Sequence, residues 1–136
     1  MRLVESLDKE LSEVGAEARN LVAGGQTALA ALGVAIRRLG HAALVADDGG
    51  KLLLANEAAS RLTGYSLDEL LRLAVTDLTP QLLESHSEML WLQFITEGRQ
   101  AGDYRVLGKH ERVVTATYVA EKNLLPGLHV SLLASL

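Results

Sequence analysis

The histidines are the side chains of this sequence with the clearest capacity for chemistry, and one of them stands on an apolar stripe. Four residues after Thr79 fall at offsets of zero, three, seven and eleven, the spacing of one helix face: Leu83, His86, Leu90 and Phe94. A neutral imidazole nitrogen on such a face can act as a metal ligand. It can equally be satisfied by neighbouring protein groups or stay half exposed, and the sequence leaves these alternatives open.

The other three histidines offer no second constellation. His41, His110 and His129 are scattered, without an acidic neighbour or a second histidine at ligand spacing. The pair Asp47-Asp48 is explained by a hairpin turn, because adjacent strand residues point to opposite faces. No nucleophile stands beside a base and a residue that would orient it. The sequence therefore predicts neither a zinc site nor a catalytic centre.

Composition narrows the class of protein. The 136 residues, 49% hydrophobic and 22% charged, suffice for one globular domain with a core plus a helical appendage. A net charge of -4 and a basic cluster limited to Arg37-Arg38 argue against nucleic-acid binding. The absence of cysteine excludes disulfides, thiolate metal sites and cysteine nucleophiles. The apolar stretch 28–36 is shorter than the roughly 20 residues of a membrane helix, and no signal peptide opens the chain, so we expect a cytoplasmic protein.

Two amphipathic helices are predicted in residues 1–39. In the first, apolar residues recur at alternating spacings of three and four up to Gly24-Gly25, and in the second the same spacing runs to Leu39 before Gly40. We treat residues 1–39 as an N-terminal helical segment and residues 40–136 as a separate domain.

The apolar seam of these helices needs a partner, and two alternatives stay open. The helices can cover one side of the adjacent domain, or they can join two chains in a homodimer. A regular two-stranded zipper is disfavoured, because the acidic residues beside the seam have no basic complement, so a helical bundle fits better. The residues predicted at a dimer interface are Val4, Leu7, Leu11, Val14, Leu21, Leu32 and Ile36.

The segment 42–71 predicts a hairpin followed by two short helices. Apolar runs at 43–46 and 52–55 flank an Asp-Gly turn, a strong short-range hairpin signal. Asn56 ends the second run and opens a short helix. Ser66 with Glu69 three residues later forms the pattern of a capping box, which begins the next helix.

The second half predicts one long helix and three strands. Thr79-Pro80 is typical of a helix start, and we extend that helix to Glu97 with Gly98 as its stop. β-branched residues and period-two alternation then predict strands at 103–107, 112–121 and 128–136. With the first hairpin, these give an α+β fold with a five-stranded antiparallel sheet and flanking helices, preceded by the N-terminal amphipathic helices.

The order of these motifs resembles that of PAS sensory domains over residues 40–136. In that family a D-x-x-G turn precedes an asparagine-opened helix, a leucine, a Gly-Tyr pair and an acidic helix ending in leucine. The matching residues here are Asp47, Gly50, Asn56, Ala59, Leu62, Gly64, Tyr65, Glu69 and Leu70. The sequence departs from the pattern at Arg72 and at the turn 108–111.

The resemblance implies a signal-input module that feeds an output domain elsewhere in a bacterial-type signalling or transcriptional regulatory protein. Family ligands lie between the sheet and the long helix, which makes His86, Leu90, Phe94, Tyr104 and Arg105 candidate binding residues. Haem-binding relatives carry their iron ligand on this helix, so His86 is a candidate haem ligand and Arg105 a candidate polar gate. We expect no flavin, since Trp91 is explained as core and the family's flavin–cysteine adduct requires a cysteine.

Three hypotheses about function follow. The first is a sensory domain that binds a small apolar ligand, the second a haem-based gas or redox sensor, and the third a structural dimerisation module with a filled core. Small apolar residues expected on the inner face of the sheet can leave a cavity or can be covered by the long helix, and the sequence leaves both open: Ala55, Ala116, Ala120 and Ala134.

Overall fold

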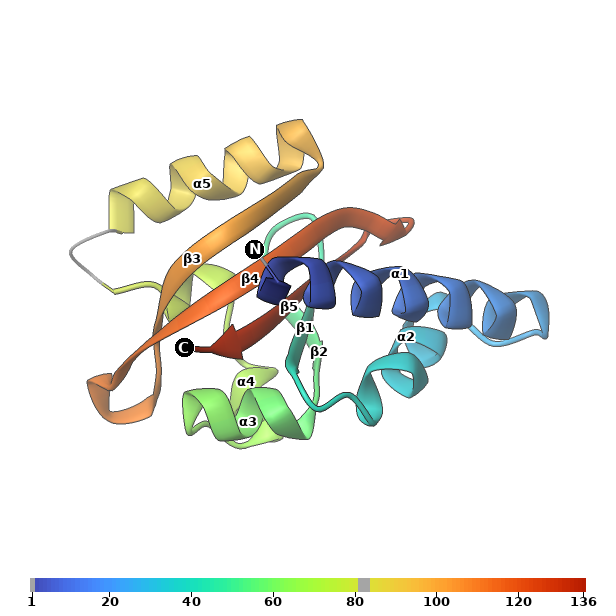
Figure 1. Ribbon diagram of the computed structural model, residues 1–136, viewed down its shortest axis with the longest axis horizontal. Helices are drawn as coiled ribbons and strands as arrows, with labels where there is room; N and C mark the ends of the chain where they lie inside the picture. Colours follow the sequence, from blue (N-terminus) through green and yellow to red (C-terminus); the bar gives the residue numbers. More distant parts are fainter. Residues whose placement is uncertain (1, 81–83) are drawn as a thin grey trace.

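The computed structural model describes the backbone of residues 2–80 and 84–136 and the side chains of residues 3–80 and 91–136. Helices and strands follow the predicted order (Figure 1). The helices are α1 (Arg2–Ala23), α2 (Ala28–Arg37), α3 (Glu57–Thr63), α4 (Leu67–Leu70) and α5 (Glu84–Glu97), with 3-10 turns η1 (Val75–Leu78) and η3 (Lys109–Glu111). The strands are β1 (Ala42–Ala46), β2 (Leu52–Ala55), β3 (Arg99–Leu107), β4 (Val113–Leu125) and β5 (Leu128–Ser135).

The strands form one five-stranded sheet in the order β2-β1-β5-β4-β3. Every neighbouring pair is antiparallel, which confirms the predicted fold class. β3 begins at Arg99, earlier than the sequence pattern indicated, because its first residues pair with β4 as far as Glu121. β4 likewise continues beyond the predicted end to Leu125.

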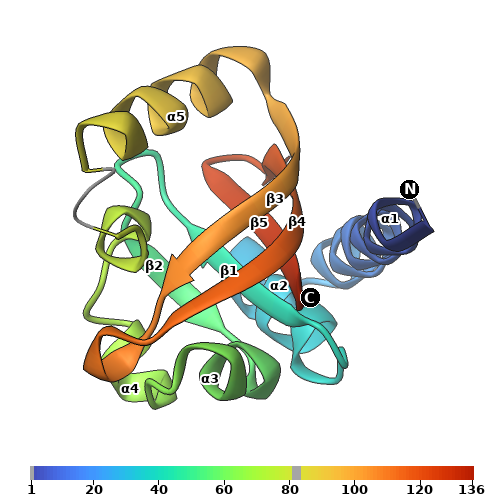
Figure 2. The same cartoon turned by 60° about the vertical axis from the view of Figure 1, so that its left-hand side comes forward.

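The helices α1 and α2 cover the outer face of the sheet, while α3, α4 and α5 lie on the opposite side (Figure 2). Each face has its own apolar core. The outer core joins the seam of α1 and α2 to strand residues that point outward, among them Val119, Val130, Leu132 and Ala134. Residues 1–39 therefore pack on the sheet of residues 40–136 through a shared core.

This packing corrects the prediction of an exposed dimer seam. Leu7, Leu11 and Val14 are at most 2% exposed within the single chain, as are Leu32 and Ile36. Val4 and Leu21 are partly buried against the same outer core. The seam faces the chain's own sheet, so these residues do not form a free interface. Association of two chains remains a prediction.

Asn56 joins three elements on the inner side of this arrangement. Its Oδ1 accepts hydrogen bonds from the backbone N–H groups of Ala43 and Ala59, each at 3.0 Å. Its Nδ2 donates to the carbonyl oxygens of Ile36 and His41, also at 3.0 Å. The side chain is 3% exposed, and all of these bonds lie within the fold. Asn56 thereby caps α3 and fixes the end of α2 against β1.

The turn after β3, where the sequence departs from the family pattern, is held close to α3. A Cβ added at Gly108 would stand 2.5 Å from the carbonyl oxygen of Thr63, so only glycine allows this approach. His110 and Glu111 follow with φ angles of 61° and 60°, a left-handed conformation that non-glycine residues adopt rarely.

The long helix ends as predicted at Glu97, and Gly98 follows with a φ of 87°. Its predicted start at Thr79-Pro80 leads into residues 81–83, which lie outside the described residues. The described part of α5 begins at Glu84. No helix within the described ranges is long and apolar enough to cross a membrane.

Candidate functional site

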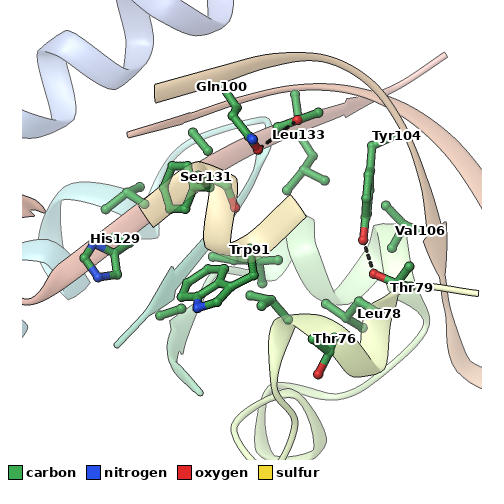
Figure 3. Close-up of a pocket in the computed structure, with 17 residues that line it drawn as sticks. Thr76, Leu78, Thr79, Trp91, Gln100, Tyr104, Val106, His129, Ser131 and Leu133 are labelled. Carbon is green, nitrogen blue, oxygen red and sulfur yellow. Dashed lines mark hydrogen bonds between the residues drawn. The ribbon is translucent and has the colours of Figure 1, made fainter. Parts of the chain in front are cut away.

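A cavity of about 130 Å³ lies between the inner face of the sheet and the helix α5 (Figure 3). Its walls come from β1, β3, β4 and β5, from η1 and from the second half of α5. Most of the wall is aliphatic or aromatic. The lining residues are Leu44, Ala46, Val75, Thr76, Leu78, Thr79, Trp91, Phe94, Gln100, Tyr104, Val106, Tyr118, Ala120, His129, Val130, Ser131 and Leu133.

The sheet places these side chains by strand alternation. In β3, Gln100, Tyr104 and Val106 share a parity and face the cavity, whereas Arg105 points the other way and is exposed. The prediction of Arg105 as a gate over the ligand is therefore wrong: it stands between two inward residues and so projects from the outer face.

Two tyrosine hydroxyl groups supply much of the polarity of the cavity. The hydroxyl of Tyr104 is hydrogen bonded to Oγ1 of Thr79 (Figure 3), and the hydroxyl of Tyr118 donates to Oε1 of Gln100 at 3.3 Å. The two rings meet edge to face with centroids 5.7 Å apart. Burial raises the pKa of both phenols, and for Tyr118 the neighbouring Tyr104 contributes further. Both hydroxyls are therefore neutral at physiological pH and able to donate.

Three aromatic side chains pack together at one end of the cavity. The rings of Trp91 and Phe94 on α5 are 5.5 Å apart, and both meet the ring of His129 on β5 edge-on, at 6.0 and 6.1 Å. Trp91 also donates from Nε1 to the carbonyl oxygen of Asp48 at 3.3 Å. This contact fixes α5 to the turn between β1 and β2.

His129 is the most constrained polar side chain of the site, at 2% exposure. Its Nδ1 accepts a hydrogen bond from the backbone N–H of Asn123 at 2.9 Å. Its Nε2 lies 2.7 Å from Oδ1 of Asp48. Because Nδ1 accepts, the ring hydrogen of the neutral imidazole is on Nε2 and is donated to the carboxylate.

The predicted binding residues divide into three groups. Phe94 and Tyr104 line the cavity as expected, and Arg105 does not. The side chains of His86 and Leu90 lie outside the described residues, so haem ligation by His86 remains a prediction. The cavity of about 130 Å³ is smaller than the roughly 300–1,000 Å³ pockets that hold drug-sized ligands.

Sequence reasoning missed Tyr118, Gln100 and the pair His129–Asp48. A signal for His129 existed, since it alternates with Val130 and Leu132 and so had to face away from the outer core. Its partner Asp48 stands 81 residues away, and sequence spacing carries no information about such a contact. Of the alanines expected on the inner face of the sheet, Ala120 lines the cavity. Ala134 instead belongs to the outer core, so its predicted placement is wrong. No group of three metal-binding side chains occurs among residues that the structure describes.

Comparison with known families decides the classification of this arrangement. The sequence model of the PAS fold matches residues 32–124. The chain belongs to the PAS family. The match includes the hairpin, the capping box, the cavity strands β3 and most of β4. A comparison with curated protein sequences found no match.

Solved PAS domains share the fold of this one at low sequence identity. A PAS domain from Colwellia psychrerythraea is 18% identical with a TM-score of 0.66, and the alignment covers 76% of this chain and 92% of that one. A domain of a sensory box sensor histidine kinase/response regulator from Geobacter sulfurreducens is 20% identical, with a TM-score of 0.62 and coverage of 74% and 87%.

A third PAS domain was crystallised in complex with ethanol. It belongs to a transcriptional regulator of the LuxR family from Burkholderia thailandensis. It is 13% identical to this chain with a TM-score of 0.63, and the alignment covers 76% of this chain and 95% of the other.

Proposed function

We propose that this PAS domain is the signal-input module of a cytoplasmic, bacterial-type signalling or transcriptional regulatory protein, and that its inner cavity binds a small, uncharged, largely apolar molecule. Ligand binding would favour one packing of sheet and helix over another and so shift the populations of the two. The observation that carries the proposal is an apolar cavity, inside the sheet, into which neutral tyrosine hydroxyls project.

The chemistry of the wall defines the ligand class. No lysine, arginine, aspartate or glutamate is among the described lining residues, so a charged ligand would lose its hydration without an ionic partner. The hydroxyl of Tyr104 can turn its hydrogen toward a ligand oxygen when Thr79 donates to it, whereas Tyr118 donates its hydrogen to Gln100 and offers its oxygen as an acceptor. A small alcohol, ketone or ether satisfies both conditions, and the cavity of about 130 Å³ limits it to a few non-hydrogen atoms.

The structural neighbours support the same reading. One belongs to a sensor histidine kinase/response regulator and another to a transcriptional regulator whose PAS domain holds ethanol. Both names are of signalling or regulatory proteins, and the complex with ethanol supports a small alcohol as the ligand class.

The test uses 1-butanol as a neutral probe and butyrate as its charged counterpart. We expect 1-butanol to raise the midpoint of thermal unfolding and to change the fluorescence of Trp91, the single tryptophan, which lines the cavity. A probe at a hundred times its Kd stabilises a protein by about 2.7 kcal/mol. Butyrate at equal concentration should have little effect.

Two alanine variants separate binding in the cavity from solvent effects. Ala120→Leu fills the cavity, since Ala120 is on its wall, and should abolish the response to 1-butanol. Ala101→Leu is the matched control, because Ala101 is exposed on the opposite parity of β3 and should leave the response intact. Equal responses in both variants, or an equal response to butyrate, would overturn the proposed ligand class. Native mass spectrometry of freshly purified protein would report a retained natural ligand.

A further inference from the structure

The ring of His129 touches both the cavity and the end of the β4–β5 hairpin (residues 123–127), where the register of β4 is irregular. On the cavity side, its edges meet Trp91 and Phe94 with centroids 6.0 and 6.1 Å away. On the other side, its Nδ1 holds the backbone N–H of Asn123 at 2.9 Å. One buried side chain therefore connects α5 with the end of the β4–β5 hairpin.

The hairpin end is held in part by the contact with His129. Asn123 has a φ of 53°, a left-handed conformation that costs a non-glycine residue free energy. Two hydrogen bonds hold it: its N–H to Nδ1 of His129, and its own Oδ1, which accepts from the N–H of Gly127 at 2.9 Å. If the imidazole shifts, the first of these bonds lengthens and the left-handed conformation of Asn123 loses part of its support.

The residues after Asn123 belong to the outer core beneath α1. Leu124 and Leu125 are 7% and 6% exposed and pack with the seam of α1. Leu124 approaches α1 at Gly15, where an added Cβ would stand 3.1 Å from the leucine Cδ1. A change in the backbone at Asn123 would therefore move Leu124 and alter its packing against the middle of α1.

Asp48 fixes the imidazole from the far side. Its carboxylate takes the Nε2 hydrogen of His129 at 2.7 Å, and its carbonyl oxygen accepts from Trp91. Asp48 is 81% exposed at its side chain, so the buried ring pairs with a solvent-facing carboxylate. This pairing fixes the tautomer in which Nδ1 is free to accept from Asn123.

We propose that His129 is a positioning residue that couples occupancy of the cavity to the end of the β4–β5 hairpin at Asn123 and, through Leu124, to the packing of α1. The inference rests on the proposed function, because it needs a ligand that displaces Trp91 or Phe94. It adds the route by which the inner face of the sheet reaches the N-terminal helix on the outer face.

The experiment follows the backbone amides of the full chain by NMR while 1-butanol is added. In the unmodified protein, shifts are expected at cavity residues, at 123–125 and at the middle of α1. His129→Gln keeps a donor near Asp48 but has no acceptor at the position of Nδ1, and it should reduce the shifts at 123–125 and in α1 about threefold or more while cavity shifts persist. His129→Asn restores an acceptor near that position and should recover them.

Hydrogen exchange provides a measurement without ligand. Phe94→Leu frees space beside the imidazole, and we expect amide exchange at 123–125 and in α1 to become about threefold faster in the unmodified background but to stay unchanged when His129→Gln is also present. Asp48→Ala changes an exposed side chain and should weaken the butanol response in α1, which provides a further test should His129→Gln fail to fold.

The outcomes separate the two proposals. If 1-butanol shifts the cavity residues and α1 equally in the unmodified protein, His129→Gln and Asp48→Ala, the coupling through His129 is wrong and the proposed function stands. If 1-butanol shifts no cavity residue, the proposed ligand class is wrong, and the exchange rates in the Phe94→Leu variants alone decide whether His129 couples the two faces. If Phe94→Leu accelerated amide exchange at 123–125 and in α1 equally with and without His129→Gln, the coupling through His129 would be overturned.

Discussion

At the scale of single residues, the capping box at Ser66 forms as the sequence predicted, and a lysine far away in the sequence also binds its glutamate. Oγ of Ser66 accepts from the N–H of Glu69 at 3.1 Å, and the carboxylate of Glu69 accepts from the N–H of Ser66 at 2.9 Å, as the sequence pattern predicted. The structure adds Lys109, whose Nζ lies 2.8 and 3.0 Å from the two carboxylate oxygens. Mainly this lysine, with the backbone N–H of Ser66, lowers the pKa of Glu69 to about 2.

The lowered pKa leads to a test by acid titration. Lys109→Met should raise the pKa of Glu69 from about 2 toward the ordinary value of 4.5, as followed by carboxyl carbon NMR. A depressed carboxyl pKa stabilises the fold above about pH 4.5, and that contribution is lost as the pH falls toward 2. The stability difference between the unmodified protein and Lys109→Met should therefore shrink across this window. Lys51→Met is the control, since Lys51 donates to the carbonyl oxygen of Leu71; an equal change in the pKa of Glu69 there would contradict the assignment.

At the scale of elements, the apolar spacing of α1 is compatible with packing against either a second helix or a sheet. Apolar residues at spacings of three and four require a partner surface, but the pattern is the same whether that surface is a second helix or a sheet. In this chain the surface is the outer face of β4 and β5, and Leu7, Leu11 and Val14 are buried against it. The helix is also held by an ion pair between Asp8 and Arg99 and by a hydrogen bond between Glu10 and Nδ1 of His41.

Substitutions at two leucines test how much the seam of α1 contributes to the free energy of unfolding. Leu11→Ala should lower the free energy of unfolding by about 2–5 kcal/mol, because Leu11 is 2% exposed in the outer core. Leu92→Ala, at a leucine 65% exposed on α5, should change it by no more than about 0.5 kcal/mol. Chemical denaturation gives both values. If Leu11→Ala dissociated an oligomer and left the stability of the single chain unchanged, the intramolecular packing of α1 would be refuted.

At the scale of the whole molecule, one sheet carries two cores back to back. The cavity lies on its inner face and the N-terminal helices on its outer face (Figures 1 and 2). Each central strand contributes alternate residues to both, so Val119 belongs to the outer core while its neighbours Tyr118 and Ala120 line the cavity. A chain built this way should unfold as one unit.

The cooperativity of unfolding distinguishes a single folding unit from the division into residues 1–39 and 40–136 that the sequence favoured. The fluorescence of Trp91 reports the inner face, and far-ultraviolet circular dichroism is dominated by helix, of which α1 is the longest described segment. The two signals should give the same midpoint in a urea titration. Distinct transitions, with the helical signal lost first, would mean that residues 1–39 fold independently of the sheet.

The sequence by itself determined the order of elements and many of their ends. Turn and capping residues act within a few positions along the chain, so the Asp-Gly hairpin, the Asn56 cap, the Ser66 box and the stop at Gly98 are readable without a fold. Helical spacing placed Phe94, and the family resemblance placed Tyr104, among the residues that line the cavity. The family could be inferred because its pattern consists largely of such local signals.

Only the tertiary structure decided which surfaces meet. Burial of the α1 seam on the sheet, the contact of His129 with Asp48, and the cavity between Tyr118 and α5 all join residues far apart in sequence. Apolar periodicity specifies that a face must be covered but not by what, because the hydrophobic effect is non-directional. A cavity is likewise a property of how several walls fit together, and no single segment encodes it.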